Sequence, residues 1–195
     1  FLLVAIGFES LLVVIAMVIG WLCGFSPWYD VSVAGMSGVE QSMHLLFWGL
    51  AGTAPPVAVL LLEDNPRWRA FTELKHQVSR LLDRLVHRAA YWQLFVLACF
   101  AGFGEELLFR GLLQAGLMYL LPSTIAVVGS LLIASLVFGM CHYLSHTYFI
   151  LATLAGIYFG LLMLASGSVV PAIIAHALYD FIALAYLLSE SQQRD

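Results

Sequence analysis

The sequence predicts an all-α membrane protein, a polytopic bundle of about six transmembrane helices with an amphipathic helix on its cytoplasmic surface. Hydrophobic residues make up 62% of the 195 residues, whereas roughly half is usual in soluble domains, and the mean hydropathy is +0.95. Several continuous apolar runs approach the roughly 20 residues that a helix needs to cross a bilayer. Six of the eight basic residues fall within residues 67–88, as expected of a cytoplasmic connection between spans.

The apolar runs predict one membrane domain that covers residues 1–195. The spans are expected near residues 1–24, 43–62, 89–121, 124–144, 148–165 and 169–188. A polar connector occupies residues 63–88, and a polar tail occupies residues 189–195. Pro55 and Pro56 should kink the second span, which is tolerated where neighbouring helices satisfy the freed backbone groups. Glu9 interrupts the first span, and the sequence leaves its role open.

The connector has a helical pattern of its own. Its apolar residues recur at helical spacing at Phe71, Leu74, Val78, Leu81, Leu82 and Leu85. Because the basic residues lie largely off this stripe, we expect an amphipathic helix on the membrane surface, in contact with anionic lipid headgroups. The positive-inside rule makes the connector cytoplasmic, and both chain termini with it. The basic patch is short and flanked by spans, which argues against nucleic-acid binding.

Three charged residues lie close together in the third span, within a long apolar run: Glu105, Glu106 and Arg110. Charges at membrane depth are costly and usually functional. Glu106 and Arg110 are four residues apart, so on a helix they share a face and can pair. Glu105 lies about 100° around the helix from Glu106. It is left without a local cation, an arrangement that suits general acid–base chemistry. The alternative is that both glutamates only brace neighbouring helices.

Two later spans each carry a histidine in apolar surroundings. His142 lies in the fourth span, and His176 lies in the sixth, where Asp180 follows four residues later on the same helical face. One such histidine is usually structural, but two on separate spans, with a carboxylate pair on a third, indicate a shared site. We therefore expect one convergent polar cluster around a water molecule, made of Glu105, Glu106, Arg110, His142, His176 and Asp180.

These stretches resemble the motifs of the CPBP family, the CAAX-protease and bacteriocin-processing (Abi) intramembrane endopeptidases. The family pattern is Glu-Glu-x-x-x-Arg, then Phe-x-x-x-His, then His-x-x-x-Asn or Asp, on separate helices. Here the motifs run from Glu105 to Arg110, from Phe138 to His142, and from His176 to Asp180. The order matches, and the resemblance covers residues 91–188. The first two spans carry no recognisable motif.

The resemblance implies an intramembrane glutamic endopeptidase that hydrolyses a peptide bond in a membrane-bound or lipid-modified protein or peptide. Glu105 would be the general base that activates a water molecule, with His142 helping to hold it. His176 and Asp180 would polarise the scissile carbonyl or stabilise the oxyanion. An ionised Asp180 cannot donate a hydrogen bond, so it could instead orient His176 and leave that ring as the donor. Supporting roles would fall to Glu106, Arg110 and Phe138.

A zinc-dependent metalloprotease is the mechanistic alternative. Glu105, His142 and His176 could form a three-ligand site of the catalytic zinc type. His146 lies four residues after His142, but the chain has no His-Glu-x-x-His motif, and His146 should be exposed beyond the end of the span. We favour a metal-free enzyme without a cofactor. A cysteine nucleophile at Cys141 is disfavoured, because adjacent helical residues point about 100° apart.

Two further interpretations come from other functional classes. A non-catalytic membrane protein, such as an immunity factor or scaffold, could retain the same polar core. A proton-coupled transporter also uses Glu and His, but six spans without internal repeats argue against it. The sequence predicts membrane lipid and a membrane-bound substrate as partners, and it names neither the substrate nor any partner protein. The short chain favours an integral protein of a prokaryotic cell membrane.

Overall fold

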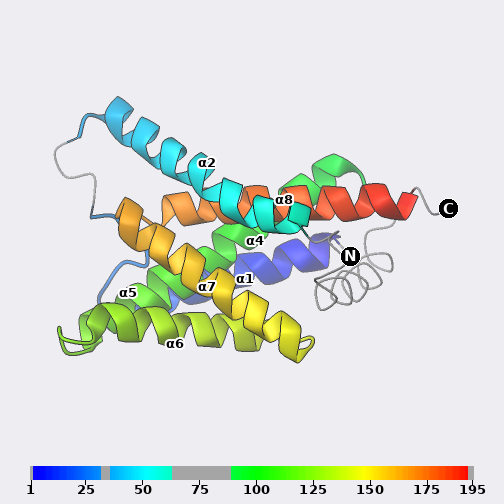
Figure 1. Cartoon of the computed structure of the whole chain (residues 1–195). Coiled ribbons are helices and arrows are strands. Elements are labelled where there is room, and N and C mark those ends of the chain that lie inside the picture. Colours follow the sequence, from blue (N-terminus) through cyan, green and yellow to red (C-terminus); the bar gives the residue numbers. More distant parts are fainter. Residues whose placement is uncertain (1, 32–35, 63–88, 193–195) are drawn as a thin grey trace.

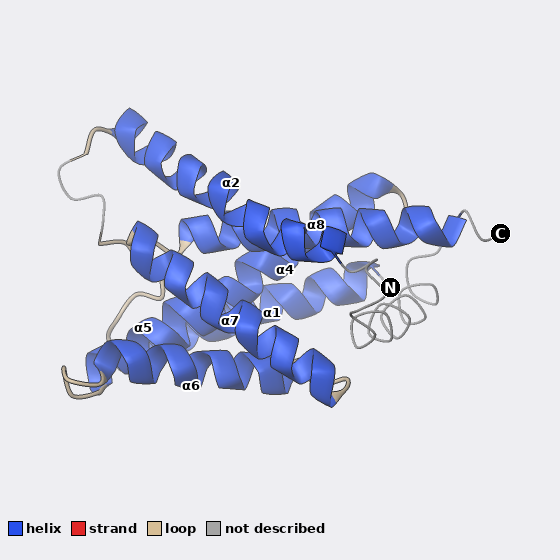
Figure 2. Cartoon of the chain, viewed as in Figure 1, coloured by secondary structure: helices blue, strands red, loops and turns tan. Residues whose placement is uncertain are grey.

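A computed structural model describes residues 2–31, 36–62 and 89–192 (Figure 1). Within these ranges the chain forms helices and no strand, apart from one isolated bridge between Asp30 and Ser168 (Figure 2). The predicted all-α class is therefore confirmed. The predicted amphipathic helix falls within residues 63–88 and lies outside the described residues, as does the end of the tail.

The described helices match the six predicted spans, with shifted boundaries. They are α1 (Leu2–Cys23), α2 (Gly38–Leu62), α4 (Tyr91–Glu106) continuing through η1 (Leu107–Gln114) into α5 (Ala115–Leu120), α6 (Ala126–Cys141), α7 (His146–Ser166) and α8 (Val170–Gln192). By length and composition, α1, α2, α7 and α8 can each cross a membrane, whereas α6 is apolar but shorter. The second helix begins earlier than predicted, where Ser37 and Glu40 form reciprocal side-chain contacts with each other's backbone N–H.

The third predicted span contains a feature that its sequence does not indicate. Residues Leu107–Gln114 form a π-helix directly after the two glutamates. A π-helix has i→i+5 hydrogen bonds, is rare, and is frequent at functional sites. Arg110 lies within this segment, so the number of residues per helical turn changes between the two glutamates and Arg110.

The helix α4 is central to the bundle and packs against both α1 and α8. Figure 1 shows α1 beside α4, with α6 and α7 crossing on one side and α2 running along α8. Small residues permit close approach, as in many membrane bundles. A Cβ atom added at Gly102 would lie 2.7 Å from the backbone nitrogen of Ala177 on α8. These contacts bring α4, α6 and α8, which carry the three motifs, to one interior region.

Many large apolar side chains face outward. Leu3, Trp21, Tyr119 and Leu120 are each more than three-quarters exposed. An apolar outer surface of this kind is costly in water but favourable in lipid. Together with the length of the helices, it identifies an integral membrane protein.

Candidate active site

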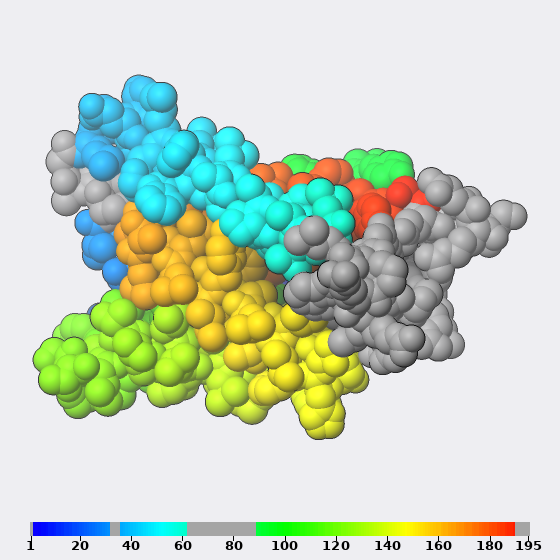
Figure 3. All heavy atoms as spheres, viewed as in Figure 1, coloured from blue at the N-terminus to red at the C-terminus, as the bar shows by residue number. Residues whose placement is uncertain are grey.

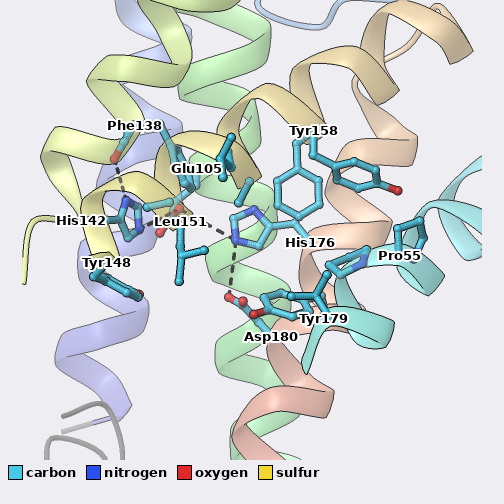
Figure 4. Close-up of a pocket in the computed structure, with 16 residues that line it drawn as sticks. Pro55, Glu105, Phe138, His142, Tyr148, Leu151, Tyr158, His176, Tyr179 and Asp180 are labelled. Atoms are coloured by element: carbon cyan, nitrogen blue, oxygen red, sulfur yellow. Dashed lines mark hydrogen bonds and ion pairs between the residues drawn. The ribbon is translucent and has the colours of Figure 1, made fainter. Parts of the chain in front are cut away.

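The three motifs meet at one cluster of polar side chains (Figure 4). Glu105 and Glu106 end α4, while Arg110 lies in the π-helix η1. His142 is the C-cap residue of α6, one residue beyond the helix in which it was predicted. His176 and Asp180 are one helical turn apart on α8. The six residues predicted to converge do so among the described helices.

Glu106 and Arg110 form the buried side of this cluster. Both side chains are completely inaccessible, and Nε of Arg110 lies 3.1 Å from Oε2 of Glu106. The contact is an ion pair by distance, since no guanidinium nitrogen makes an aligned hydrogen bond among the described residues. The Arg110 Cζ atom also lies 5.0 Å from the centroid of the Phe138 ring. A carboxylate and an aromatic face together compensate this buried cation.

The other oxygen of Glu106 holds His176. Nδ1 of His176 lies 2.8 Å from Oε1 of Glu106. Because a carboxylate oxygen is an acceptor, Nδ1 carries the proton. The ring is further fixed by stacking on Phe159, with centroids 4.8 Å apart and planes at 8°. Its Nε2 atom consequently points at two other carboxylates: Asp180 at 3.5 Å and Glu105 at 4.0 Å.

His142 is held by the residue that begins its own motif. Its Nδ1 atom lies 2.9 Å from the backbone oxygen of Phe138, which can only accept, so Nδ1 donates. The Phe138 ring stacks on the imidazole with centroids 4.3 Å apart. The Phe-x-x-x-His spacing thus supplies both a carbonyl and an aromatic platform from one helical turn. Nε2 is left facing Glu105, 3.4 Å from its Oε2 atom.

Glu105 therefore lies between the Nε2 atoms of two histidines. Its side chain is 13% exposed, and Oε2 accepts no hydrogen bond from the described residues. This oxygen is the one atom of the cluster that faces both rings. Such a carboxylate can accept a proton from a bound water molecule, with a histidine nitrogen within reach of the same water.

The same region of the chain matches a known family. Residues 87–182 match the family model described as type II CAAX prenyl endopeptidase Rce1-like. This region, just under half of the chain, is similar to the Rce1-like family. Comparisons with curated proteins and with solved structures gave no match. The match supports a CAAX-protease-like peptidase and agrees with the resemblance to the CPBP family.

The Rce1-like region includes all three motifs and excludes α1 and α2, yet both of these helices contribute to the site. On α1, Glu9 lies against the residue before Glu105: a Cβ atom added at Gly104 would lie 2.6 Å from the backbone oxygen of Glu9 and 3.4 Å from its Oε2. This Oε2 atom is buried without a hydrogen-bond partner among the described residues. The only signal in the sequence was the interruption of an apolar run.

A cavity of about 520 Å³ adjoins the cluster. Its charged and imidazole lining is Glu105, His142, His176 and Asp180, and the remaining wall is mainly apolar and comes mostly from α2 and α7. Tyr148 and Tyr158 of α7 and the two prolines of α2 also line it. Sequence analysis missed these wall residues, because apolar side chains of a span give no sign of whether they face a cavity or lipid.

A zinc site would need at least three His, Cys, Asp or Glu side chains around one point. Among the described residues, no three His, Cys, Asp or Glu side chains are arranged to hold a metal ion. His146 is exposed, as predicted, and contacts the Tyr143 hydroxyl at 3.2 Å. Cys141 is an exposed free thiol and has no contact with the cluster.

Proposed function

We propose that the protein is an intramembrane endopeptidase that hydrolyses a peptide bond in a membrane-bound or lipid-modified protein or peptide. The Rce1-like family match supports peptidase activity of the CAAX type. The observation that carries the mechanism is the position of Glu105 Oε2, which lies 3.4 Å from Nε2 of His142 and 4.0 Å from Nε2 of His176.

In the proposed reaction, a water molecule binds between Glu105 and His142. Glu105 takes one proton from the water molecule, and the water oxygen forms a bond to the scissile carbonyl carbon. The carbonyl oxygen becomes negative in the tetrahedral intermediate and accepts a hydrogen bond from the Nε2–H of His176. Glu105 then returns the proton to the amide nitrogen as the C–N bond breaks, which releases an amine and a carboxylic acid.

The buried side of the cluster would keep the oxyanion donor in position. Nδ1 of His176 donates its hydrogen bond to Glu106, so this ring can donate to the substrate oxygen only from Nε2. Asp180 lies 3.5 Å from Nε2 and would stabilise that proton electrostatically, although it cannot itself donate when ionised. The Arg110 ion pair fixes the Glu106 carboxylate.

We further propose cytoplasmic chain termini, on the basis of the basic connector.

The test uses the purified full chain in liposomes, with a farnesylated CAAX peptide and an unmodified apolar peptide as probes. We expect cleavage to be lost in Glu105→Gln and in His142→Ala, while Glu40→Gln, a matched change at an exposed glutamate of α2, cleaves normally. Mass spectrometry of the products identifies the cleaved bond. Normal cleavage by both site variants would refute the assignment.

The same liposomes test the alternatives. Loss of cleavage on treatment with a chelator, and its return with zinc, would replace the glutamate mechanism by the metalloprotease one. Failure of the wild type on every probe, with the protein folded, would favour the non-catalytic immunity or scaffold role. Sequencing the termini of any peptide that co-purifies with the chain would identify a natural substrate.

A further inference from the structure

The helix α2 cannot satisfy its own backbone at the two prolines. In an α-helix the N–H of residue 56 would donate to the carbonyl of Gly52, but Pro56 has no N–H. The Gly52 carbonyl is buried, and an unpaired carbonyl is costly in an apolar environment. Its partner must therefore come from outside the helix.

That partner is a tyrosine of α7. The hydroxyl of Tyr158 donates a hydrogen bond of 2.6 Å to the Gly52 oxygen. Tyr158 is 106 residues further along the chain, so the bond joins two helices that are otherwise connected by few contacts. We call this hydrogen bond the α2–α7 bridge. Figure 3 shows α2 and α7 as neighbouring bands on one face of the molecule.

The bridge lies at the point where α2 changes from tight packing to lining the cavity. Before the prolines, glycines bring α2 close to its neighbours: a Cβ atom at Gly49 would lie 2.7 Å from Ile174, and one at Gly52 would lie 2.6 Å from Leu162. From Pro55 onward, α2 side chains line the cavity instead, as Val59 does. Figure 1 shows α2 changing direction along its length, as proline kinks cause.

Of the two partners of the bridge, Tyr158 lines the cavity, and Gly52 precedes the two prolines of α2 that line it. Tyr158 and Pro55 line the cavity at one end, with His142 at the other and His176 between them (Figure 4). Wall residues Val59 and Leu154 are about half exposed, 49% and 54%, so the cavity reaches the apolar outer surface between α2 and α7. An apolar group next to the scissile bond fits such a wall, and a charged group does not.

We propose that Tyr158 is a positioning residue: by holding the proline bend of α2 through the α2–α7 bridge, it sets the size of the apolar substrate group accepted beside the scissile bond. This inference rests on the proposed function, because it concerns the substrate of the same site. Tyr158 acts on the substrate through α2 and through the width of the cavity, and takes no part in the bond-breaking step.

The experiment is a double-mutant cycle between the two sides of the bridge. Tyr158→Phe removes only the hydroxyl, and Pro56→Ala gives α2 an N–H that can reach the Gly52 carbonyl. Loss of the hydrogen bond should raise KM for an apolar peptide roughly 5- to 30-fold, with kcat changed less than about twofold. In the Pro56→Ala background, Tyr158→Phe should change KM less than about twofold.

A series of probe peptides reports the size of the accepted group. The peptides differ only in the residue beside the cleaved bond, which is Ala, Leu or Trp. We expect Tyr158→Phe to reduce the discrimination between these three, while Tyr143→Phe, at an exposed tyrosine with no place in the cavity wall, leaves it unchanged. Independent effects of Tyr158→Phe and Pro56→Ala, or a loss in kcat alone, would overturn the inference.

Binding measured without turnover separates this inference from the proposed function. The three peptides are titrated into Glu105→Gln variants with and without Tyr158→Phe, and binding is followed by fluorescence. A shift in size preference with no cleavage by the wild type refutes the peptidase assignment, and the α2–α7 bridge then sets the size of a bound apolar group and not of a substrate group. If the wild type cleaves the peptides and Tyr158→Phe leaves the size preference unaltered in both assays, the peptidase assignment stands and the inference is refuted.

Discussion

Glu105 and Glu106 are adjacent in sequence but belong to two different environments. Glu106 is fully buried and has two charged or hydrogen-bonding partners, Arg110 and His176. Glu105 borders the cavity, and its partners are two histidine nitrogens at 3.4 Å and 4.0 Å. The turn of about 100° between consecutive helical residues separates them. One carboxylate is thus enclosed by partners, and its neighbour borders the cavity.

This difference shows how a membrane protein can keep several charges in its interior. Each buried charge in the Glu106 environment has a partner, so its role is to fix positions. The charged groups that border the cavity keep polar atoms without a hydrogen bond among the described residues, and these atoms can bind water or substrate. Substitutions at Glu105 should therefore lower activity more than stability, and substitutions at Glu106 and Arg110 should lower stability.

Glu105→Gln should have the largest effect on activity. We expect cleavage to fall by roughly 10²- to 10⁴-fold, since a general base commonly contributes that much. The unfolding free energy in detergent should change by less than about 1 kcal/mol, because the side chain has no aligned hydrogen bond through Oε2. Initial cleavage rates and denaturant unfolding measure the two quantities. A variant that loses both together would show that Glu105 is structural.

Arg110→Met tests the opposite environment. Removing Arg110 breaks a buried ion pair and leaves the Glu106 carboxylate with His176 as its remaining partner, so the unfolding free energy should fall by about 3–5 kcal/mol. Denaturant unfolding of the detergent-solubilised protein measures this loss. The double variant Glu106→Gln/Arg110→Met should recover much of the stability, since neither charge then remains alone. An unchanged stability in Arg110→Met would remove the distinction between the two environments.

Phe138 connects the environments and should show an intermediate effect. Its buried ring contacts the Arg110 guanidinium, stacks on His142 and meets Phe109 edge to face, with centroids 5.1 Å apart. Phe138→Leu keeps an apolar side chain but loses these ring contacts, at about 1–2 kcal/mol of unfolding free energy. Cleavage should also decrease, because His142 loses its platform. Phe100→Leu, at a partly exposed ring outside the cluster, is the matched control.

The sequence predicted the fold class and the members of the polar cluster because both depend on strong local signals. A charge inside an apolar run is expensive, so Glu105, Arg110 and Asp180 could be recognised without coordinates. The i, i+4 spacings predicted the Glu106–Arg110 pair and the shared face of His176 and Asp180, and the distances agree. Their roles in catalysis remain a proposal that the experiments above address.

Other features could not be predicted because they depend on packing. The π-helix at Leu107–Gln114 uses residues that equally suit an α-helix. Cavity-wall residues such as Val59 cannot be told from lipid-facing ones by composition. The sequence showed that Pro56 would free a carbonyl of α2, but not that Tyr158 would satisfy it. Glu9 was visible as a charge, but its neighbours were not.

Glu9 offers the finest test of the comparison and the smallest expected effect. It is a fourth carboxylate beside the cluster, with a buried Oε2 atom and no hydrogen-bond partner there among the described residues. Glu9→Gln removes the charge and keeps the shape, so the unfolding free energy should change by no more than about 1 kcal/mol. Cleavage should change less than about tenfold, because no bond of the proposed reaction involves Glu9. A loss comparable to that of Glu105→Gln, measured in the same liposomes, would mean that α1 supplies a second reacting carboxylate, whereas we assign the proton transfers to Glu105 alone.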